Sequence, residues 1–257
     1  MTHTPGFVID AAASAAFARL SGDFNPLHVD ELAARRLQFG GTVCHGVHLV
    51  LRAIEHIAAS GALSGMAVAA VSAVFHQPVR TGTAVKLSTL ADASGLRFKI
   101  TGAVDGRAQF TAQLLLAAAS GDSLGVPGSE PEADTGAQVP RFPADELAQR
   151  ALAGAVPLRL NAGLLRQLLP ALAPWRDGPA LAADLMATTR IVGMHCPGLH
   201  SIYSEFKLQR RDAPQVQPAM AFEVIKADPR FQKVRIGVQG ALMAGLLEAF
   251  FRAPPVA

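Results

Sequence analysis

The chain has 257 residues, half of them apolar and 17% charged, so it can bury one large core or two smaller ones and is not a disordered chain. Its formal net charge is only +3, and a single Trp and a single Tyr offer few platforms for stacking bases, so we expect no nucleic-acid groove. No apolar run reaches the roughly 18 residues that cross a bilayer, and residues 1–10 lack the segments of a secretory signal, so we expect a cytoplasmic protein.

Helices are predicted first along the chain. Apolar spacing predicts a helix at about residues 11–20, and Asn25 followed by Pro26 predicts the start of a short second one, because Asn is a good N-cap and Pro fits the first helical position. The longest helix is predicted from about Gly46 to Ser60, where apolar residues recur every three or four positions and form one buried stripe. The other side of this helix carries His48, Arg52 and Glu55, and we expect His48 to face away from the core.

Strands are predicted to follow as an antiparallel meander. The candidate strands lie at residues 68–77, 83–90, 96–104 and 108–117. The dipeptide Asp105-Gly106 between the last two is a strong hairpin signal. One long helix packed against such a sheet makes an α+β layer.

The second half of the chain repeats this order. Residues 120–143 are rich in Gly, Pro, Ser and acidic residues and are predicted to be a linker between domains at 1–119 and 144–257. The later elements are predicted as a helix-rich region at 145–173, a helix at about 179–192 and strands at 199–209, 221–227, 231–238 and 240–252. His45 and Phe75 are 30 positions apart, as are Arg176 and Phe206, which indicates a diverged internal duplication.

Asp23 and His28 are the candidate catalytic residues. Asp23 lies just before the predicted N-cap Asn25, and His28 lies in the first helical turn, so a carboxylate and an imidazole meet at one helix start. The positive end of the helix dipole disfavours a charged imidazole, which would leave His28 neutral and able to accept a proton. Such a pair can activate a water molecule and return a proton. On local features alone, a capping Asp23 and a surface His28 are the favoured interpretation, because such caps are common.

Gly46 is the candidate oxyanion-binding residue. It opens the longest predicted helix, so its N–H has no acceptor within the helix, and a residue without a side chain lets a ligand carbonyl approach the backbone. A donor of this kind can stabilise negative charge on an oxygen in a dry site. Taken alone, an ordinary helix start with a tight packing contact is the simpler explanation of this glycine.

The twelve residues from Phe17 to His28, FARLSGDFNPLH, resemble the hydratase-2 signature of MaoC-like hot-dog proteins, which reads aromatic, then Ser-Gly-Asp-x-Asn-Pro-aliphatic-His. Phe39 and the pair His45-Gly46 follow at the family's usual distance. The resemblance covers roughly residues 10–120. With this signature present, the catalytic interpretation of the carboxylate and the imidazole is preferred to the capping one.

The resemblance implies a double hot dog, an α+β fold in which two antiparallel sheets, each wrapped around a central helix, are fused in one chain. A homodimer of such chains is one assembly that it allows. The implied reaction is the reversible hydration of a trans-2-enoyl thioester of CoA or of an acyl carrier protein to the (R)-3-hydroxyacyl thioester. Asp23 and His28 would jointly activate a water, the Gly46 N–H would polarise the thioester carbonyl, and Asn25 would orient the loop. No cofactor and no metal are implied.

The second half carries no such signature and is expected to be non-catalytic. It holds no Asp-x-Asn-Pro-x-x-His arrangement, and Asp177, with Gly178 next to it, stands at the position that matches Gly46. A fused inactive copy would complete the pair of sheets, with the site at their seam. It would also be free to make room for a large acyl group.

Cysteines and histidines outside the signature are given structural interpretations. Cys44 and Cys196 are expected to be reduced thiols, and Cys44 is expected to be a small packing residue and not a nucleophile. His195, Cys196 and His200 lie in a Pro-Gly loop and at one strand start, a spacing that favours a supporting loop over a metal site. We expect that His200 or Tyr203 could reach the pocket.

Two other functions stay open at this point. A hot-dog thioesterase would use a carboxylate to attack or activate water at the carbonyl, and it would not need the neighbouring histidine. A non-catalytic protein that binds acyl thioesters would need neither group. These patterns do not encode the acyl chain length, the carrier or the direction of the reaction.

Overall fold

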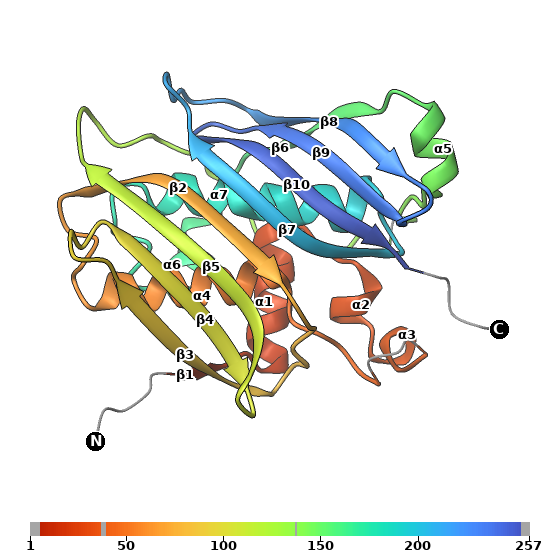
Figure 1. The fold of residues 1–257 in the computed structure, drawn as a ribbon, viewed down its shortest axis with the longest axis horizontal. Helices are drawn as coiled ribbons and strands as arrows, with labels where there is room; N and C mark the ends of the chain where they lie inside the picture. Colours follow the sequence, from red (N-terminus) through yellow and green to blue (C-terminus); the bar gives the residue numbers. More distant parts are fainter. Residues whose placement is uncertain (1–5, 37–39, 137, 253–257) are drawn as a thin grey trace.

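The computed structural model describes residues 6–36, 40–136 and 138–252 (Figure 1), so Phe39 lies outside the described residues. The helices are α1 (Ala11–Ser21), α2 (Pro26–Val29), α3 (Glu31–Arg35), α4 (Gly46–Ala59), α5 (Ala144–Gln149), α6 (Ala162–Leu168) and α7 (Gly178–Arg190), which continues into a π-helical turn, η1 (Ile191–His195). The strands are β1 (Gly6–Val8), β2 (Met66–Phe75), β3 (Ala84–Ala91), β4 (Arg97–Val104), β5 (Arg107–Ala118), β6 (Ala153–Pro157), β7 (Ser201–Arg210), β8 (Ala219–Asp228), β9 (Lys233–Gln239) and β10 (Met243–Phe251).

The ten described strands form one continuous sheet, in the order β1-β3-β4-β5-β2-β7-β10-β9-β8-β6, and all neighbours are antiparallel. The N-terminal and C-terminal halves meet where β2 pairs with β7, from Ala70 opposite Gln209 to Val74 opposite Glu205. We expected two sheets, and the structure joins them because each half offers the other an edge strand whose N–H and C=O groups need partners. All eight predicted strands are present, with ends that differ by a few residues.

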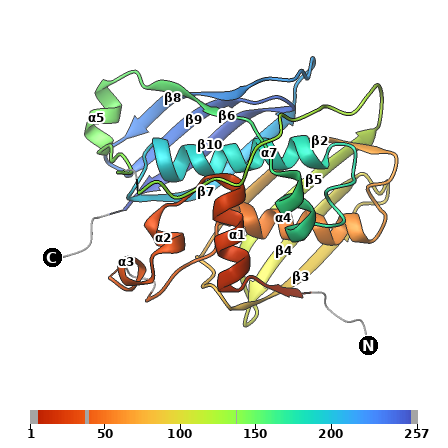
Figure 2. The same ribbon diagram turned by 180° about the vertical axis from the view of Figure 1, so that it is seen from behind.

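The long helices lie together on one face of the sheet, as Figure 2 shows from behind. Helix α4 packs against β4, α7 packs against β10 and β6, and the two helices contact each other. Each half is therefore a five-stranded sheet with one long helix on its inner face. The repeated order of elements agrees with the predicted duplication.

The side of α4 that we expected to face away from the core is also buried. His48 is only 1% exposed and its ring stacks on Phe17 at 4.3 Å between centroids, so the prediction for His48 is wrong. Glu55 accepts hydrogen bonds from the two backbone N–H groups of residues 171–172, and Arg52 donates to a carbonyl of α6. The reason is that the C-terminal half covers this side of α4, so its polar residues bond across the contact between the halves.

The segment between the halves packs along both of them. Glu132 donates its backbone N–H to the Arg19 carbonyl of α1 at 2.7 Å, and its carboxylate pairs with Arg159 and Arg190. A single buried apolar cluster extends through both halves. The domain boundaries at 119 and 144 stay a proposal. Within the described ranges, no helix is both long enough and apolar enough to span a membrane.

Candidate active site

The loop between α1 and α2 brings the predicted residues to the start of α4. The chain turns after α1 at Gly22, whose φ of 72° lies in the left-handed region that favours glycine. Asn25 then caps α2, because its Oδ1 accepts a hydrogen bond from the Leu27 N–H at 3.1 Å, and Pro26 takes the first helical position. This local geometry presents the carboxylate of Asp23 and the ring of His28 to the same space.

Asp23 is a buried carboxylate, 1% exposed, that contacts the C-terminal half. Its Oδ2 accepts a hydrogen bond from the Thr189 hydroxyl at 2.8 Å, and its Oδ1 accepts one from the Asn25 N–H at 3.2 Å. Burial raises the pKa of the Asp23 carboxyl, while His28 and the two hydrogen bonds lower it to a smaller extent. Asp23 is therefore a stronger base than a free aspartate, and both of its oxygens are held in place.

His28 is half-buried, and its ring is oriented by one backbone contact. Its Nδ1 lies 2.8 Å from the Val43 carbonyl oxygen. A carbonyl only accepts hydrogen bonds, so Nδ1 carries the hydrogen and Nε2 is the proton-accepting atom of the neutral ring. The tautomer is thus set by the backbone that leads into α4, and it suits a base.

His45 is a third member of the cluster, which sequence reasoning did not assign to the site. Its Nε2–H donates to the Asp23 backbone carbonyl at 3.0 Å and lies 3.8 Å from Asp23 Oδ2. Its ring stacks on His28 at 3.8 Å between centroids. Burial, with a smaller contribution from His28, lowers the pKa of His45 well below its usual value, so the ring is neutral. Its place directly before Gly46 was the available signal.

These three side chains are also the group that could hold a metal ion within the described part of the chain, since their donor atoms lie within 4.8 Å of one another. However, His28 Nδ1 and His45 Nε2 already donate to backbone carbonyls, and both Asp23 oxygens accept hydrogen bonds. The arrangement is therefore that of a hydrogen-bonded network, in which His28 Nε2 and the buried His45 Nδ1 are the two ring nitrogens without a hydrogen bond to the described residues.

Gly46 is the first residue of α4, as predicted, and lines the same space as Asp23 and His28. Its N–H has no acceptor within the helix, and no other hydrogen bond to it is formed by the described residues. A Cβ at this position would lie 2.8 Å from the Phe75 ring, so only glycine allows that ring to pack here. Gly46 therefore serves packing and also leaves a free amide.

A cavity of about 230 Å³ joins these groups and is walled by both halves of the chain. This volume lies somewhat below the roughly 300–1,000 Å³ that is usual for ligand sites. The N-terminal half contributes Asp23, Asn25, Leu27, His28, Val43, Cys44, Gly46, Leu49, Phe75, His76, Gln77, Pro78 and Val79, and the C-terminal half contributes Thr189, Val192, Gly193, Ser201, Ile202 and Tyr203.

The C-terminal half takes a direct part in the site through η1 and the end of α7. Asn25 donates its side-chain N–H to the Gly193 carbonyl at 2.9 Å. A Cβ at Gly193 would lie 2.5 Å from Asp23 Oδ1, so a glycine is needed for this approach. Thr189, described above, completes the contact. No local pattern in the sequence pointed to these residues, because they reach Asp23 only through the packing of the two halves.

The backbone amide that corresponds to Gly46 in the C-terminal half is already used. Helix α7 starts at Gly178, so Gly178 and not Asp177 corresponds to Gly46, one residue from the position that spacing predicted. The Gly178 N–H donates to the Trp175 carbonyl at 2.8 Å, and a Cβ there would lie 1.9 Å from the Leu172 carbonyl oxygen. This amide is closed off by the chain itself.

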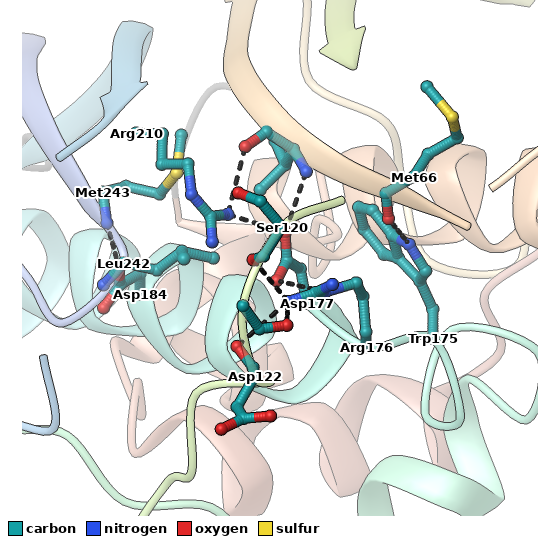
Figure 3. A network of polar contacts seen from close by, with 12 residues as sticks. Met66, Ser120, Asp122, Trp175, Arg176, Asp177, Asp184, Arg210, Leu242 and Met243 are labelled. Atoms are coloured by element: carbon teal, nitrogen blue, oxygen red, sulfur yellow. Dashed lines mark hydrogen bonds and ion pairs between the residues drawn. The ribbon is translucent and has the colours of Figure 1, made fainter. Parts of the chain in front are cut away.

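An ion pair fills the rest of the corresponding region (Figure 3). Asp177 is fully buried, and its Oδ2 accepts hydrogen bonds from Arg210 Nη1 at 2.7 Å and from the Val68 N–H at 2.9 Å. Arg176 beside it donates to carbonyl oxygens of residues 120–122. The second region is thus occupied by structural contacts of the chain itself.

The remaining candidates lie at or near the cavity. Tyr203 lines it, whereas His200 lines a separate hollow at the start of β7. Among the residues that the structure describes, no potential metal-binding group includes His195, Cys196 or His200. Cys44 lines the cavity, and burial raises the pKa of its thiol to about 11, so the thiol is protonated at neutral pH.

Comparison with known proteins matches the first half of the chain to one family. Residues 2–108 match the family model described as a MaoC like domain. The protein named Probable dehydratase NIT22, from Ajellomyces capsulatus, is 35% identical over 96 residues, which make up 36% of this chain and 24% of that protein. The chain thus corresponds to about a quarter of that relative's length.

Solved structures match nearly the whole chain. A MaoC-like dehydratase has a TM-score of 0.63 at 14% identity, over 96% of this chain and 95% of the other. RV0216 from Mycobacterium tuberculosis, described as having a double hotdog fold, has a TM-score of 0.60 at 14% identity, over 97% and 94% of the two chains. The expected double hot-dog fold is therefore confirmed, with its two sheets joined into one.

Proposed function

We propose that the chain, whose residues 2–108 match the family model of a MaoC like domain, is a hydro-lyase acting on acyl thioesters of CoA or of an acyl carrier protein. It hydrates trans-2-enoyl thioesters to (R)-3-hydroxyacyl thioesters and catalyses the reverse dehydration. One observation supports this above all: a buried carboxylate, a proton-accepting imidazole nitrogen and an unpartnered helix-start amide line a single cavity.

The proposed reaction proceeds by proton transfers within the Asp23–His28 pair. A water molecule held by the pair adds its oxygen to the β-carbon, and the proton that it loses passes to the pair. The electrons of the double bond move toward the thioester carbonyl, whose developing charge accepts a hydrogen bond from the Gly46 N–H. A proton from the pair then reaches the α-carbon on the same face, so that one water is added and the pair is restored. Because the two groups are coupled, acid and base roles belong to the pair.

The surroundings of Asp23 support this chemistry. Burial raises the pKa of the carboxyl and so makes it more basic than a free aspartate, which favours its taking part in proton transfer. Asn25 holds the loop in two ways, by donating its backbone N–H to Asp23 and its side-chain N–H to the Gly193 carbonyl. The catalytic pair is therefore fixed by the N-terminal loop on one side and by the C-terminal half on the other.

Crotonyl-CoA and longer enoyl-CoAs test the proposal. Loss of enoyl absorbance without free thiol means hydration, release of free thiol means a thioesterase, and binding with neither means a non-catalytic binding protein. Asp23→Asn and His28→Ala should each reduce hydration by about two to four orders of magnitude, as expected when a positioned acid–base group is lost. His56→Ala, on α4 but outside the cavity, is the matched control. Normal turnover in either variant of the pair overturns the assignment.

A further inference from the structure

We propose that Arg190 is a positioning residue that holds the turn before Asp23 in place, and that the segment between the halves controls Arg190 through Glu132. The inference rests on the proposed function, because it concerns the geometry of the proposed catalytic pair. Arg190 is the last residue of α7 and is not among the residues that line the cavity. It therefore acts on the reaction through the turn and not through contact with the substrate.

The guanidinium group of Arg190 lies directly against the backbone of Gly22. A Cβ at Gly22 would lie 2.9 Å from Arg190 Nη1 and 3.0 Å from its Cζ, so no other residue fits here unless the guanidinium moves. The Gly22 N–H donates to the Ala18 carbonyl at 2.8 Å and so closes the end of α1. The turn is thus bonded to α1 and covered by the last residue of α7, and the next residue in the chain is Asp23.

Glu132 holds the guanidinium group in this position. Its Oε1 lies 3.4 Å from Arg190 Nη1 and 2.8 Å from Arg159 Nη2, and its backbone N–H donates to the Arg19 carbonyl of α1 at 2.7 Å. The side chains of Glu132 and Arg190 are each only 19% exposed, so water screens this ion pair less than an ordinary surface pair. The segment at 120–143 is therefore attached to α1 and to α7, which also contact each other.

The electrostatic effect of Arg190 on Asp23 is small. Burial raises the pKa of the Asp23 carboxyl, and among the groups that lower it, His28 and the Thr189 hydroxyl act more strongly than the Arg190 charge. The loss of Arg190 should therefore act mainly on where the carboxylate lies. A misplacement of about 1 Å in a catalytic geometry can cost about a hundredfold in rate. We expect a lower kcat, with little change in KM or in the pH at which activity is lost.

Amide hydrogen exchange, followed by NMR, tests the positioning without any turnover. The N–H groups of Gly22 and Asn25 report on the turn, because they donate to the Ala18 carbonyl and to Asp23 Oδ1. Both should exchange about tenfold or more faster in Arg190→Gln than in the wild type, and by a smaller factor in Glu132→Gln.

Two controls separate this effect from a general loss of stability. Arg159→Gln removes the other partner of Glu132 and leaves the pair with Arg190 in place, so exchange at the turn should not change. The Val68 N–H, which donates to Asp177 Oδ2 at the contact between the halves, should exchange at the wild-type rate in every variant.

Steady-state hydration of crotonyl-CoA gives the second readout. Arg190→Gln should lower kcat about tenfold or more. Its KM should stay within about twofold of the wild-type value, because Arg190 does not line the cavity. Glu132→Gln should lower kcat by a smaller factor. The double variant should be no slower than Arg190→Gln alone, because Glu132 acts on the turn only through Arg190.

Three results would each overturn the proposal: unchanged exchange at the turn in both single variants, equally faster exchange at Val68, or losses of kcat that add in the double variant. If Arg190→Gln does not fold, Glu132→Gln decides the question by exchange alone, because it keeps the Arg190 side chain. Failure of the wild type to hydrate any enoyl-CoA would instead refute the proposed function, while the exchange rates would still test the positioning.

Discussion

Thr189 is the residue through which the C-terminal half acts directly on the proposed catalytic carboxylate. Its hydroxyl donates to Asp23 Oδ2 at 2.8 Å in a fully buried position, and this bond lowers the pKa of Asp23. Thr189→Val removes the hydroxyl and keeps the branched shape of the side chain. A hydrogen bond to a charged group contributes about 1.5–3 kcal/mol, and one pKa unit corresponds to about 1.36 kcal/mol. The pKa of Asp23 should therefore rise by about one to two units.

The assay is kcat/KM for enoyl-CoA hydration as a function of pH. If hydration requires the ionised carboxylate, activity falls at low pH when Asp23 takes a proton, and the variant should lose activity at a pH about one to two units higher than the wild type. At pH values well above this limb the variant should keep most of its activity. The measured value belongs to the coupled pair with His28, so the shift between variants is the quantity to compare.

The neighbouring residue provides a matched control. Thr188 is also fully buried, but its hydroxyl donates to the Leu185 carbonyl within its own helix. Thr188→Val should leave the acid limb where it is, and Thr189→Ser should restore the wild-type profile because it restores the donor. Thr189→Val could instead lower the maximum kcat/KM without changing the pH at which activity is lost on the acid side. That result would mean that Thr189 only packs against Asp23, and the electrostatic argument would be wrong.

Two further predictions concern stability. Burial raises the folded-state pKa of Asp23 above its unfolded value, so the wild type loses stability as pH rises from about 4 through the folded pKa. In thermal unfolding, Asp23→Asn should therefore have a higher Tm than the wild type at about pH 8 and nearly the same Tm at about pH 4. A Tm difference that does not change with pH would contradict the predicted direction of the effect. Asp177→Ala leaves Arg210 and the Val68 N–H without their acceptor, and urea titration should show a loss of about 3 kcal/mol, the low end for a buried pair because Arg210 is partly exposed. A loss near zero would mean that Asp177, with its ion pair to Arg210 and its hydrogen bond from Val68 of the other half, does not stabilise the fold.

Local sequence determines the parts of the fold and site that could be predicted. The Asp105-Gly106 turn forms as expected, with φ of 48° and 78°, because the hairpin needs two residues that tolerate the left-handed region. Asp23 and His28 meet because only four residues separate them and Asn25 caps the short helix that carries His28. In both places the determining contacts lie within a few residues of one another.

Contacts between distant segments explain what the sequence did not predict. Thr189 and Tyr203 reach the cavity only when the halves pack, so no spacing rule identifies them. The face of α4 that carries Glu55 is polar, and a polar helix face is normally expected to be solvated. It is buried because Glu55 accepts hydrogen bonds from backbone N–H groups of the other half, and no local pattern encodes that contact. Strand β6, in a region predicted to be helical, has few β-forming side chains and exists because β8 offers it an edge.

The fused architecture gives the two halves different tasks on either side of the β2–β7 seam. By the spacing that relates Phe75 to Phe206, Tyr203 corresponds to Ser72 on β2. In a dimer of two identical units, every substitution occurs in both units. A tyrosine on the wall of one site would then also lie on the wall of the other, and a helix-start amide bonded to its own chain, like that of Gly178, would be lost from both sites. In a single chain the C-terminal half can lose its own amide to the Trp175 carbonyl and still present Tyr203 to the site of its neighbour. The duplication therefore allows one half to supply Asp23, His28 and Gly46 while the other half walls the same cavity with residues of its own.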